Sequence, residues 1–125
     1  MNKTRNMGGW GWIGQAGTGL LLLFLLGLHM VAHHFVAQGG LRTYLDVLSY
    51  VRNPFIVGWE ATFLIVVTYH ALAGLRAVLL DLGLNDTQER RLTYALAGLG
   101  AIIVVYGLWL VAYLASQAVE VSPPA

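Results

Sequence analysis

Cysteine is absent from the 125-residue chain, and charged residues make up only 10% of it. Without thiolates the chain cannot form a disulfide, hold an iron–sulfur cluster or build a cysteine zinc site. Soluble globular chains carry about 25% charged residues. The low charge and the 58% share of hydrophobic residues exclude an ordinary soluble enzyme and a disordered chain. Seven Lys and Arg against six Asp and Glu leave no basic excess for binding nucleic acid.

Long apolar stretches take the place of a polar surface, at about residues 13–37, 55–80 and 92–115. Each is near or above the roughly 20 residues that an α-helix needs to cross the hydrocarbon layer of a membrane. Backbone groups find no water in lipid, and the stretches lack the period-two alternation of a barrel strand. The sequence therefore predicts an all-α membrane protein, a single domain over residues 1–125 with three transmembrane helices.

The segments between these stretches are short and carry their own signals. Residues of about 41–52 mix charged with apolar side chains, which is typical of a short helix lying at the membrane interface. Pro54 suits the first turn of the second long helix. Gly83 is a helix stop, and the run 85–89 with its Asn, Asp, Thr and Glu indicates the start of the next helix.

The basic residues predict the orientation in the membrane. Five of them are expected near one end of the helices: Lys3, Arg5, Arg76, Arg90 and Arg91. Only Arg42 and Arg52 are expected near the other end. By the positive-inside rule the N terminus and the second connection face the cytoplasm.

Ionisable residues inside a bilayer are costly and usually functional. His70 lies near the middle of the second long helix, on one helix face with Gly74, Ala77 and Asp81. A histidine followed one turn later by glycine suits a haem, because imidazole reaches the iron and the glycine leaves room for the porphyrin edge. The alternative is an interhelical histidine that hydrogen-bonds a neighbouring hydroxyl.

Three more histidines lie on the first long helix. His29 is deeper than His33 and His34, so it is the better candidate ligand, although His29 and His33 are also alternatives for one site. His33 and His34 are expected near the outer interface. Glu60 is the only acid within the apolar stretches, and we expect it to lie in the headgroup zone.

The run from His70 to Gly83 resembles the haem-ligand helix in the membrane-anchor subunits of succinate dehydrogenase and fumarate reductase. The family pattern is His, three residues, Gly, an apolar residue, Arg, four residues, Asp, one residue and Gly. His70, Gly74, Arg76, Asp81 and Gly83 keep each of these positions.

Two positions depart from the pattern. Ala77 stands where the family often has His or an aromatic residue, and Leu80 where an aromatic residue or Met is common. The family has two anchor types. The region 11–18 lacks the Ser and Arg of the quinone motif in the larger anchor, which favours the smaller, D-type anchor. Leu82 replaces the tyrosine usual in that type.

The resemblance implies a haem-binding anchor of succinate:quinone oxidoreductase, itself a non-catalytic subunit, in a bacterial or archaeal-type cell membrane. Its partners would be the flavoprotein subunit, the iron–sulfur subunit, membrane lipid and a second anchor that completes a haem-binding helix bundle. One or two b-type haems are implied, with His70 as the proximal iron ligand and His29 as the distal one. Gly74 and Arg76 would adjoin the cofactor, and the quinone-site candidates are Asp81, Arg76 and Trp12.

Two other functions fit the same sequence features. One is a cytochrome b subunit of another quinone-linked dehydrogenase, which would use the same histidines with a different soluble partner. The other is a small transporter or scaffold without redox chemistry, which would bind no haem. The identity of the co-purified subunits distinguishes the first alternative from a succinate:quinone oxidoreductase anchor. The absorption spectrum of the membrane distinguishes the second, which would show no b-type haem band.

Overall fold

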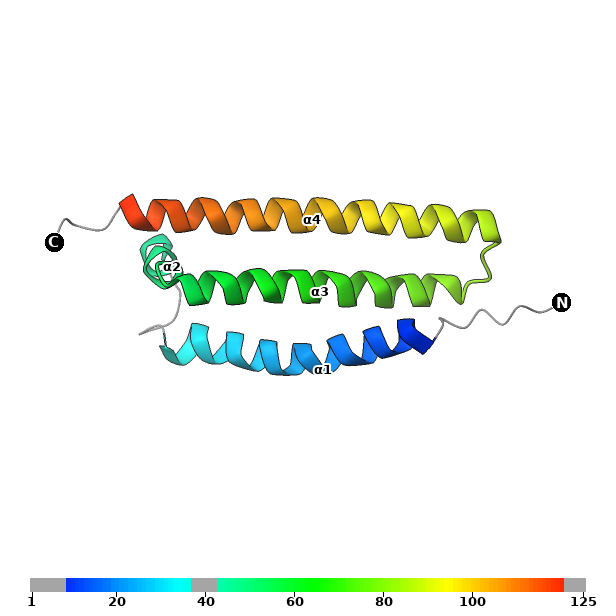
Figure 1. Ribbon diagram of the computed structural model, residues 1–125, viewed down its shortest axis with the longest axis horizontal. Coiled ribbons are helices and arrows are strands. Elements are labelled where there is room, and N and C mark those ends of the chain that lie inside the picture. The colour runs from blue at the N-terminus through cyan, green and yellow to red at the C-terminus, as the bar shows by residue number, and fades with distance from the viewer. Residues whose placement is uncertain (1–8, 37–42, 121–125) are drawn as a thin grey trace.

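A computed structural model describes residues 9–36 and 43–120, and three long helices run side by side within it (Figure 1). In chain order the elements are α1 (Gly9–Val31), the π-helical turn η1 (Ala32–Val36), α2 (Tyr44–Val51), α3 (Pro54–Leu80) and α4 (Asp86–Glu120). α3 is central, since it packs against α1 on one side and α4 on the other. No strand occurs in the described residues. The predicted all-α class is confirmed.

The helices extend beyond the apolar stretches. α1 begins at Gly9 rather than near residue 13, and its regular α geometry ends at Val31, where η1 takes over. α4 begins at Asp86, as the signals at residues 85–89 predicted, and so before its apolar stretch starts near residue 92. Asn85 and Gln88 cap its first turn with reciprocal side-chain to backbone hydrogen bonds of 2.9 and 3.0 Å. A polar first turn extends a helix beyond its apolar run, so the apolar run alone underestimates the length of the helix.

Short ends and turns fall where the sequence signals lie. Pro54 opens α3 behind Asn53, whose side chain accepts from the N–H of Phe55 at 2.9 Å. Gly83 has φ of 80°, the left-handed region that favours glycine, in the turn between α3 and α4. Outside the described residues lie Lys3 and Arg5. The same holds for Arg42 and the rest of the expected interfacial segment before residue 43.

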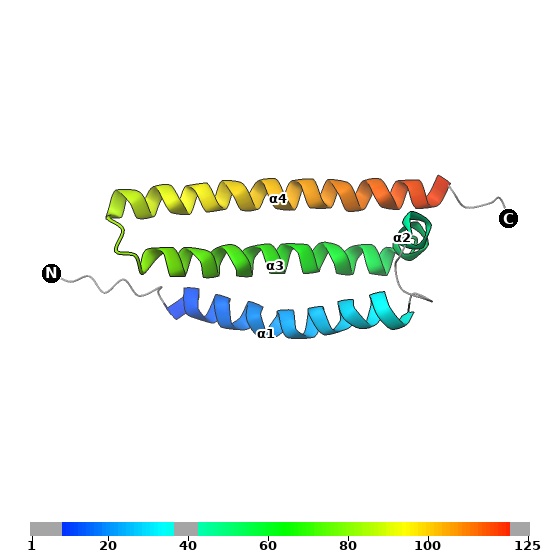
Figure 2. The same ribbon diagram turned by 180° about the vertical axis from the view of Figure 1, so that it is seen from behind.

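α2 lies across one end of the bundle, seen nearly end-on in Figures 1 and 2. A capping box starts it: Thr43 accepts from the N–H of Asp46, and the Asp46 carboxylate accepts from the N–H of Thr43. Leu48 and Val51 pack on Ala118 of α4 in a small buried cluster. This cluster fixes α2 against the end of the long helices.

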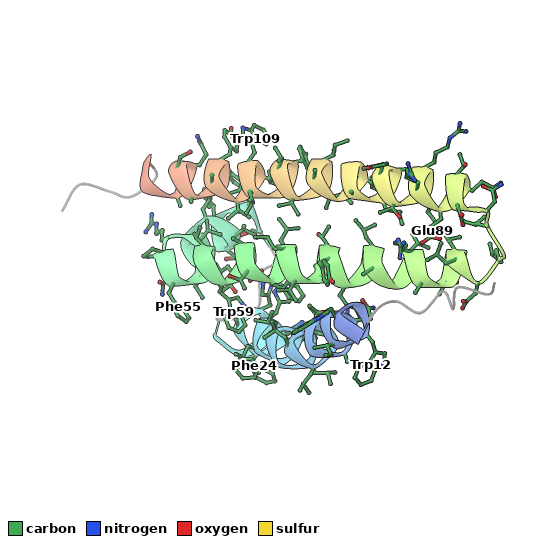
Figure 3. All side chains as sticks on the ribbon, turned by 45° about the vertical axis from the view of Figure 1, so that its right-hand side comes forward. Trp12, Phe24, Phe55, Trp59, Glu89 and Trp109 are labelled. Atoms are coloured by element: carbon green, nitrogen blue, oxygen red, sulfur yellow. The ribbon has the colours of Figure 1, made fainter. Side chains whose placement is uncertain are left out.

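Apolar side chains cover the outside of the bundle, and Figure 3 shows Trp12 and Trp109 pointing away from the neighbouring helices. Among the described residues only Leu25, Leu48, Val51, Thr68 and Ala118 are buried. In water such a surface would be strongly unfavourable. Three segments are long and apolar enough to cross a membrane: Gly9–Phe35, Pro54–Leu80 and Asp86–Ala118. The expected three transmembrane helices are therefore present.

Glycines bring α4 close to α3. A Cβ placed on Gly100 would lie 2.8 Å from the Leu72 side chain, and one on Gly107 would collide with Leu64. Gly98, by contrast, faces open space within the described chain. Small residues permit such close approach in membranes, where packing drives helix association. The seam between α3 and α4 is thus set by Gly100 and Gly107.

Candidate functional site

His70 lies inside the bundle, where its ring faces α1. Its Nδ1 is 3.1 Å from the hydroxyl of Thr18. That hydroxyl donates its own proton to the backbone carbonyl of Gly14 at 2.7 Å. With the hydroxyl proton on that carbonyl, the Thr18 oxygen would accept from His70 and Nδ1 would carry the ring hydrogen. That arrangement leaves the lone pair of the imidazole on Nε2.

The Nε2 of His70 makes no hydrogen bond to any described residue. A metal-ligating histidine almost always donates its other ring N–H to a protein acceptor, which fixes the tautomer and the ring plane. Thr18 supplies that acceptor here. The sequence left open the alternative that His70 only hydrogen-bonds a neighbouring hydroxyl, and the contact with Thr18 fits that role as well. A ligand role would additionally use the lone pair on Nε2.

Small residues on α1 and α3 make room around this histidine. A Cβ on Gly19 would come within 3.1 Å of the His70 ring. The space beside Gly74 is taken by the side chain of Gln15, whose amide nitrogen would lie 3.0 Å from a Cβ there. That amide donates to the carbonyl of His70 at 3.2 Å. Gly74 thus admits a neighbouring helix side chain to the backbone of α3.

The oxygen of the same amide is an unusual feature. Gln15 Oε1 is buried and has no hydrogen-bond partner among the described residues. A buried acceptor without a donor costs about 1–3 kcal/mol. The Gln15 amide beside His70 therefore has an acceptor oxygen that no donor of the described chain satisfies.

Arg76 lies toward the other end of α3 from Pro54 and reaches α4. Its Nε donates to Thr93 at 2.8 Å, and its Nη2 donates to the Glu89 carboxylate at 2.8 Å. The Arg76 and Glu89 side chains are 28% and 31% exposed. The guanidinium expected beside the cofactor is thus paired within the chain. The other two quinone candidates, Asp81 at the end of α3 and Trp12 on α1, are exposed.

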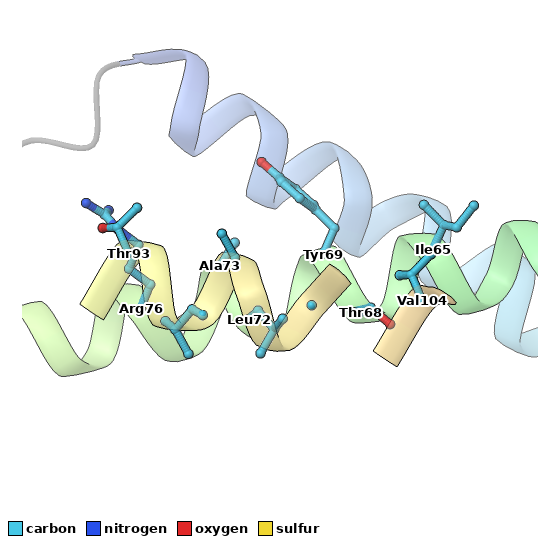
Figure 4. Close-up of a pocket in the computed structure, with 11 residues that line it drawn as sticks. Ile65, Thr68, Tyr69, Leu72, Ala73, Arg76, Thr93 and Val104 are labelled. Atoms are coloured by element: carbon cyan, nitrogen blue, oxygen red, sulfur yellow. The ribbon is translucent and has the colours of Figure 1, made fainter. Parts of the chain in front are cut away.

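An apolar groove of about 320 Å³ runs between α3 and α4, with Arg76 and Thr93 at one end (Figure 4). Thr68 and Leu72 line its α3 side, and Gly100 lines its α4 side. In the same view the Tyr69 side chain extends toward α1. His70 does not line this groove. The histidine site and the arginine site therefore lie on different sides of α3.

A second polar centre gathers around Glu60. Its carboxylate lies 3.2 Å from Nδ1 of His29 and 3.2 Å from Nε2 of His33. The hydroxyl of Tyr50 donates to the same carboxylate at 2.9 Å. Four elements meet at this side chain: α1, η1, α2 and α3. His34, the neighbour of His33, is exposed.

Aromatic rings hold the two histidines in place. The rings of His29 and His33 lie with centroids 3.9 Å apart, Phe63 stacks on His29 at 4.9 Å, and Tyr50 meets His33 edge-on at 5.0 Å. Burial first, and then the hydrogen bond to and the charge of Glu60, raise the pKa of Tyr50. Tyr50 therefore remains a neutral donor to the carboxylate at physiological pH.

Sequence reasoning did not find Glu60 or Thr18 as site residues. Glu60 carried a signal, since it is the only acid in the apolar stretches and His29 and His33 are one helical turn apart. Thr18 carried none, because 52 residues separate it from His70 and only packing brings them together.

Three apolar spans with polar centres between them define a multi-pass membrane protein. The family of succinate dehydrogenase/fumarate reductase transmembrane subunits matches residues 3–109, and the chain belongs to this family. The chain is accordingly a multi-pass protein of the cell membrane.

Two similar proteins are succinate dehydrogenase hydrophobic membrane anchor subunits from archaea. That of Thermoplasma acidophilum is 30% identical over 93 residues, which cover 74% of this chain and 76% of the relative. That of Archaeoglobus fulgidus is 34% identical over 100 residues, which cover 79% and 84%. No solved structure matches the chain.

Proposed function

We propose that this chain is the haem-binding membrane anchor of a succinate:quinone oxidoreductase. In that role it fixes a flavoprotein subunit and an iron–sulfur subunit to the membrane and helps electrons reach quinone, without catalysing succinate oxidation itself. Membership of the anchor family supports the attachment role. The observation that carries the haem role is the contact of His70 Nδ1 with Thr18, which leaves Nε2, on a membrane-spanning helix, without a partner among the described residues.

The residues around His70 fit a b-type haem. Imidazole nitrogen is a common axial ligand of haem iron, and Thr18 provides the outer hydrogen bond that orients it. Gly19 has no side chain that would crowd the His70 ring. Gly74 leaves space for the Gln15 amide, which donates to the backbone carbonyl of His70. When bound, the haem supplies one-electron redox chemistry. A second anchor subunit would complete the haem site.

His29 is the candidate ligand of a second, outward haem. Its Nδ1 faces Glu60, so its Nε2 is the nitrogen left for iron. His33 differs, because its Nε2 is the nitrogen that faces Glu60. Donation from a ligating imidazole to a carboxylate raises the basicity of the ligand. The contact with Glu60 would give a ligating His29 this outer partner and leave its Nε2 for iron.

The quinone site is proposed at the end of the bundle that holds Arg76. Nη1 of Arg76 makes no hydrogen bond within the described residues, so one arm of the guanidinium is left for a quinone oxygen or a haem propionate. Asp81 and Trp12 are exposed at the same end of the helices, where a partner subunit would cover them.

The test is purification of the whole complex through a tag on this chain. We expect a flavoprotein and an iron–sulfur protein to co-purify, with b-type haem in the reduced-minus-oxidised spectrum. A different dehydrogenase would bring a different soluble partner, and a scaffold would bring no haem. His70→Ala should lose one haem and weaken assembly, whereas His34→Ala, at an exposed histidine, should change neither. Full haem content and an unaltered spectrum in His70→Ala would overturn the ligand assignment.

A further inference from the structure

The geometry points to a divalent transition-metal site, of the kind that takes Zn²⁺, formed by His29, His33 and Glu60. One ligand atom from each residue lies within 4.8 Å of the other two. The three residues come from α1, η1 and α3, so a bound ion would tie the end of the first helix to the central one. Neither membrane anchoring nor the haem role of His70 requires such a site.

The spacing of the atoms suits coordination. The nitrogens of His29 and His33 each lie 3.2 Å from a Glu60 oxygen. With metal–ligand distances of about 2.1 Å, two ligand atoms of a tetrahedral zinc site lie roughly 3.4 Å apart. The two nitrogen–oxygen distances are therefore close to this spacing, and the two nitrogens lie within 4.8 Å of each other. An ion's two bonds to nitrogen would replace two N–H hydrogens.

The ligand types suit the same ions. Two histidine nitrogens and a carboxylate oxygen form a common protein ligand set for zinc, with a fourth position left for water. His29 and His33 are four residues apart, which places both rings on one side of the helix. Calcium and magnesium prefer all-oxygen sites, so two imidazoles argue against them.

Neighbouring groups prepare the site for an ion. Tyr50 donates to Glu60 at 2.9 Å and would orient the carboxylate from outside the coordination sphere. Stacking on Phe63 and contact with Tyr50 restrict the two imidazole rings. The side chains of His29, His33 and Glu60 are 25%, 28% and 17% exposed, so this chain does not fully enclose the three ligands.

This inference uses a different atom of His29 from the proposed second haem. The divalent ion would bind Nδ1, which faces Glu60, whereas iron would bind Nε2. One neutral imidazole offers a single lone pair, so an outward haem on His29 and the divalent ion exclude each other. The haem on His70 is unaffected by either outcome, and its spectrum reports independently on the proposed function.

The experiment is zinc titration of the purified, chelator-treated complex, with bound metal measured by mass spectrometry and its ligands by X-ray absorption. We expect one Zn²⁺ per chain with imidazole in its first shell. Glu60→Gln keeps the size of the side chain and His33→Ala removes one nitrogen, and each should weaken binding at least the roughly 10-fold that loss of an outer partner costs. The matched control His34→Ala should bind zinc as the unaltered complex does.

Three results would overturn the inference. The first is no zinc bound by a complex that retains its subunits and its His70 haem. The second is binding that Glu60→Gln and His33→Ala leave unchanged. The third is an X-ray absorption spectrum without imidazole around the metal. Retention of the His70 haem spectrum in both variants shows that the chain has folded and assembled, so loss of zinc is then due to the missing ligand.

Discussion

At the scale of single residues, the order of donors and acceptors around His70 decides which nitrogen is available. With its proton on the Gly14 carbonyl, the Thr18 hydroxyl would accept from the ring. A methyl in place of the hydroxyl would remove this acceptor while keeping the shape of the side chain. The tautomer of His70 would then no longer be fixed.

Thr18→Val is therefore expected to weaken haem binding without abolishing it. Loss of an outer hydrogen bond to a metal-ligating histidine typically costs 10- to 100-fold in metal affinity. Haem per flavin and the haem midpoint potential, both measured on the purified complex, check this expectation. Thr18→Ser retains the hydroxyl and should behave like the unaltered chain. Equal haem content and potential in Thr18→Val would show that the hydroxyl does not support the ligand.

At the scale of elements, α3 and α4 meet where glycines take the place of side chains. Gly107→Ala puts a methyl group into the Leu64 side chain, and overpacking of this kind costs about 1–3 kcal/mol. We expect a lower thermal unfolding temperature for the complex. Gly98→Ala adds the same methyl group on the same helix where the described chain leaves open space, so it is the matched control.

The two variants are compared by thermal unfolding in one detergent. Equal stability of Gly107→Ala and the unaltered complex would mean that the Leu64 side chain moves aside without cost. A loss in Gly98→Ala as large as that in Gly107→Ala would instead place a partner helix against Gly98.

The short helix α2 depends on a few buried contacts. Leu48 is 2% exposed, whereas Leu45 on the same helix is 63% exposed. Removing a buried leucine costs about 2–5 kcal/mol. Leu48→Ala should therefore raise amide hydrogen exchange across Tyr44–Val51, while Leu45→Ala should not. Exchange that rises equally in both variants would show that α2 is not held by this cluster.

The elements were largely predictable from the sequence and the polar centres were not. Long apolar runs in a chain with 10% charge can only be stable as helices in a membrane, so α3 was expected to within a residue of its start at Pro54. The pairing of Thr18 with His70 depends on how α1 is rotated against α3, which no spacing along one helix encodes. The contacts of Glu60 were equally hidden, because its partners lie on three other elements. From the sequence alone we therefore expected a headgroup carboxylate.

At the scale of the whole molecule, the absence of cysteine makes the orientation measurable. Ser49 on α2 and Thr87 in the first turn of α4 are exposed at opposite ends of the bundle. The charge distribution predicts that Ser49→Cys faces outward and Thr87→Cys faces the cytoplasm. A membrane-impermeant maleimide should therefore label Ser49→Cys in right-side-out vesicles and Thr87→Cys only in inside-out vesicles. The reverse pattern would invert the proposed orientation.

The meeting of four elements at Glu60 also bears on how the chain enters the membrane. An acidic residue costs up to about 3.5 kcal/mol at the centre of an inserted helix, and Glu60, near the start of α3, bears a smaller part of this cost. α1 is synthesised before α3, so His29 and His33 are already in place when Glu60 emerges from the ribosome. Donors that precede their acceptor in the order of synthesis lower the cost of admitting the carboxylate, provided that α1 stays beside the insertion site. The centre around Glu60 thus couples the insertion of α3, the second span, to the retention of α1, the first span, beside the insertion site.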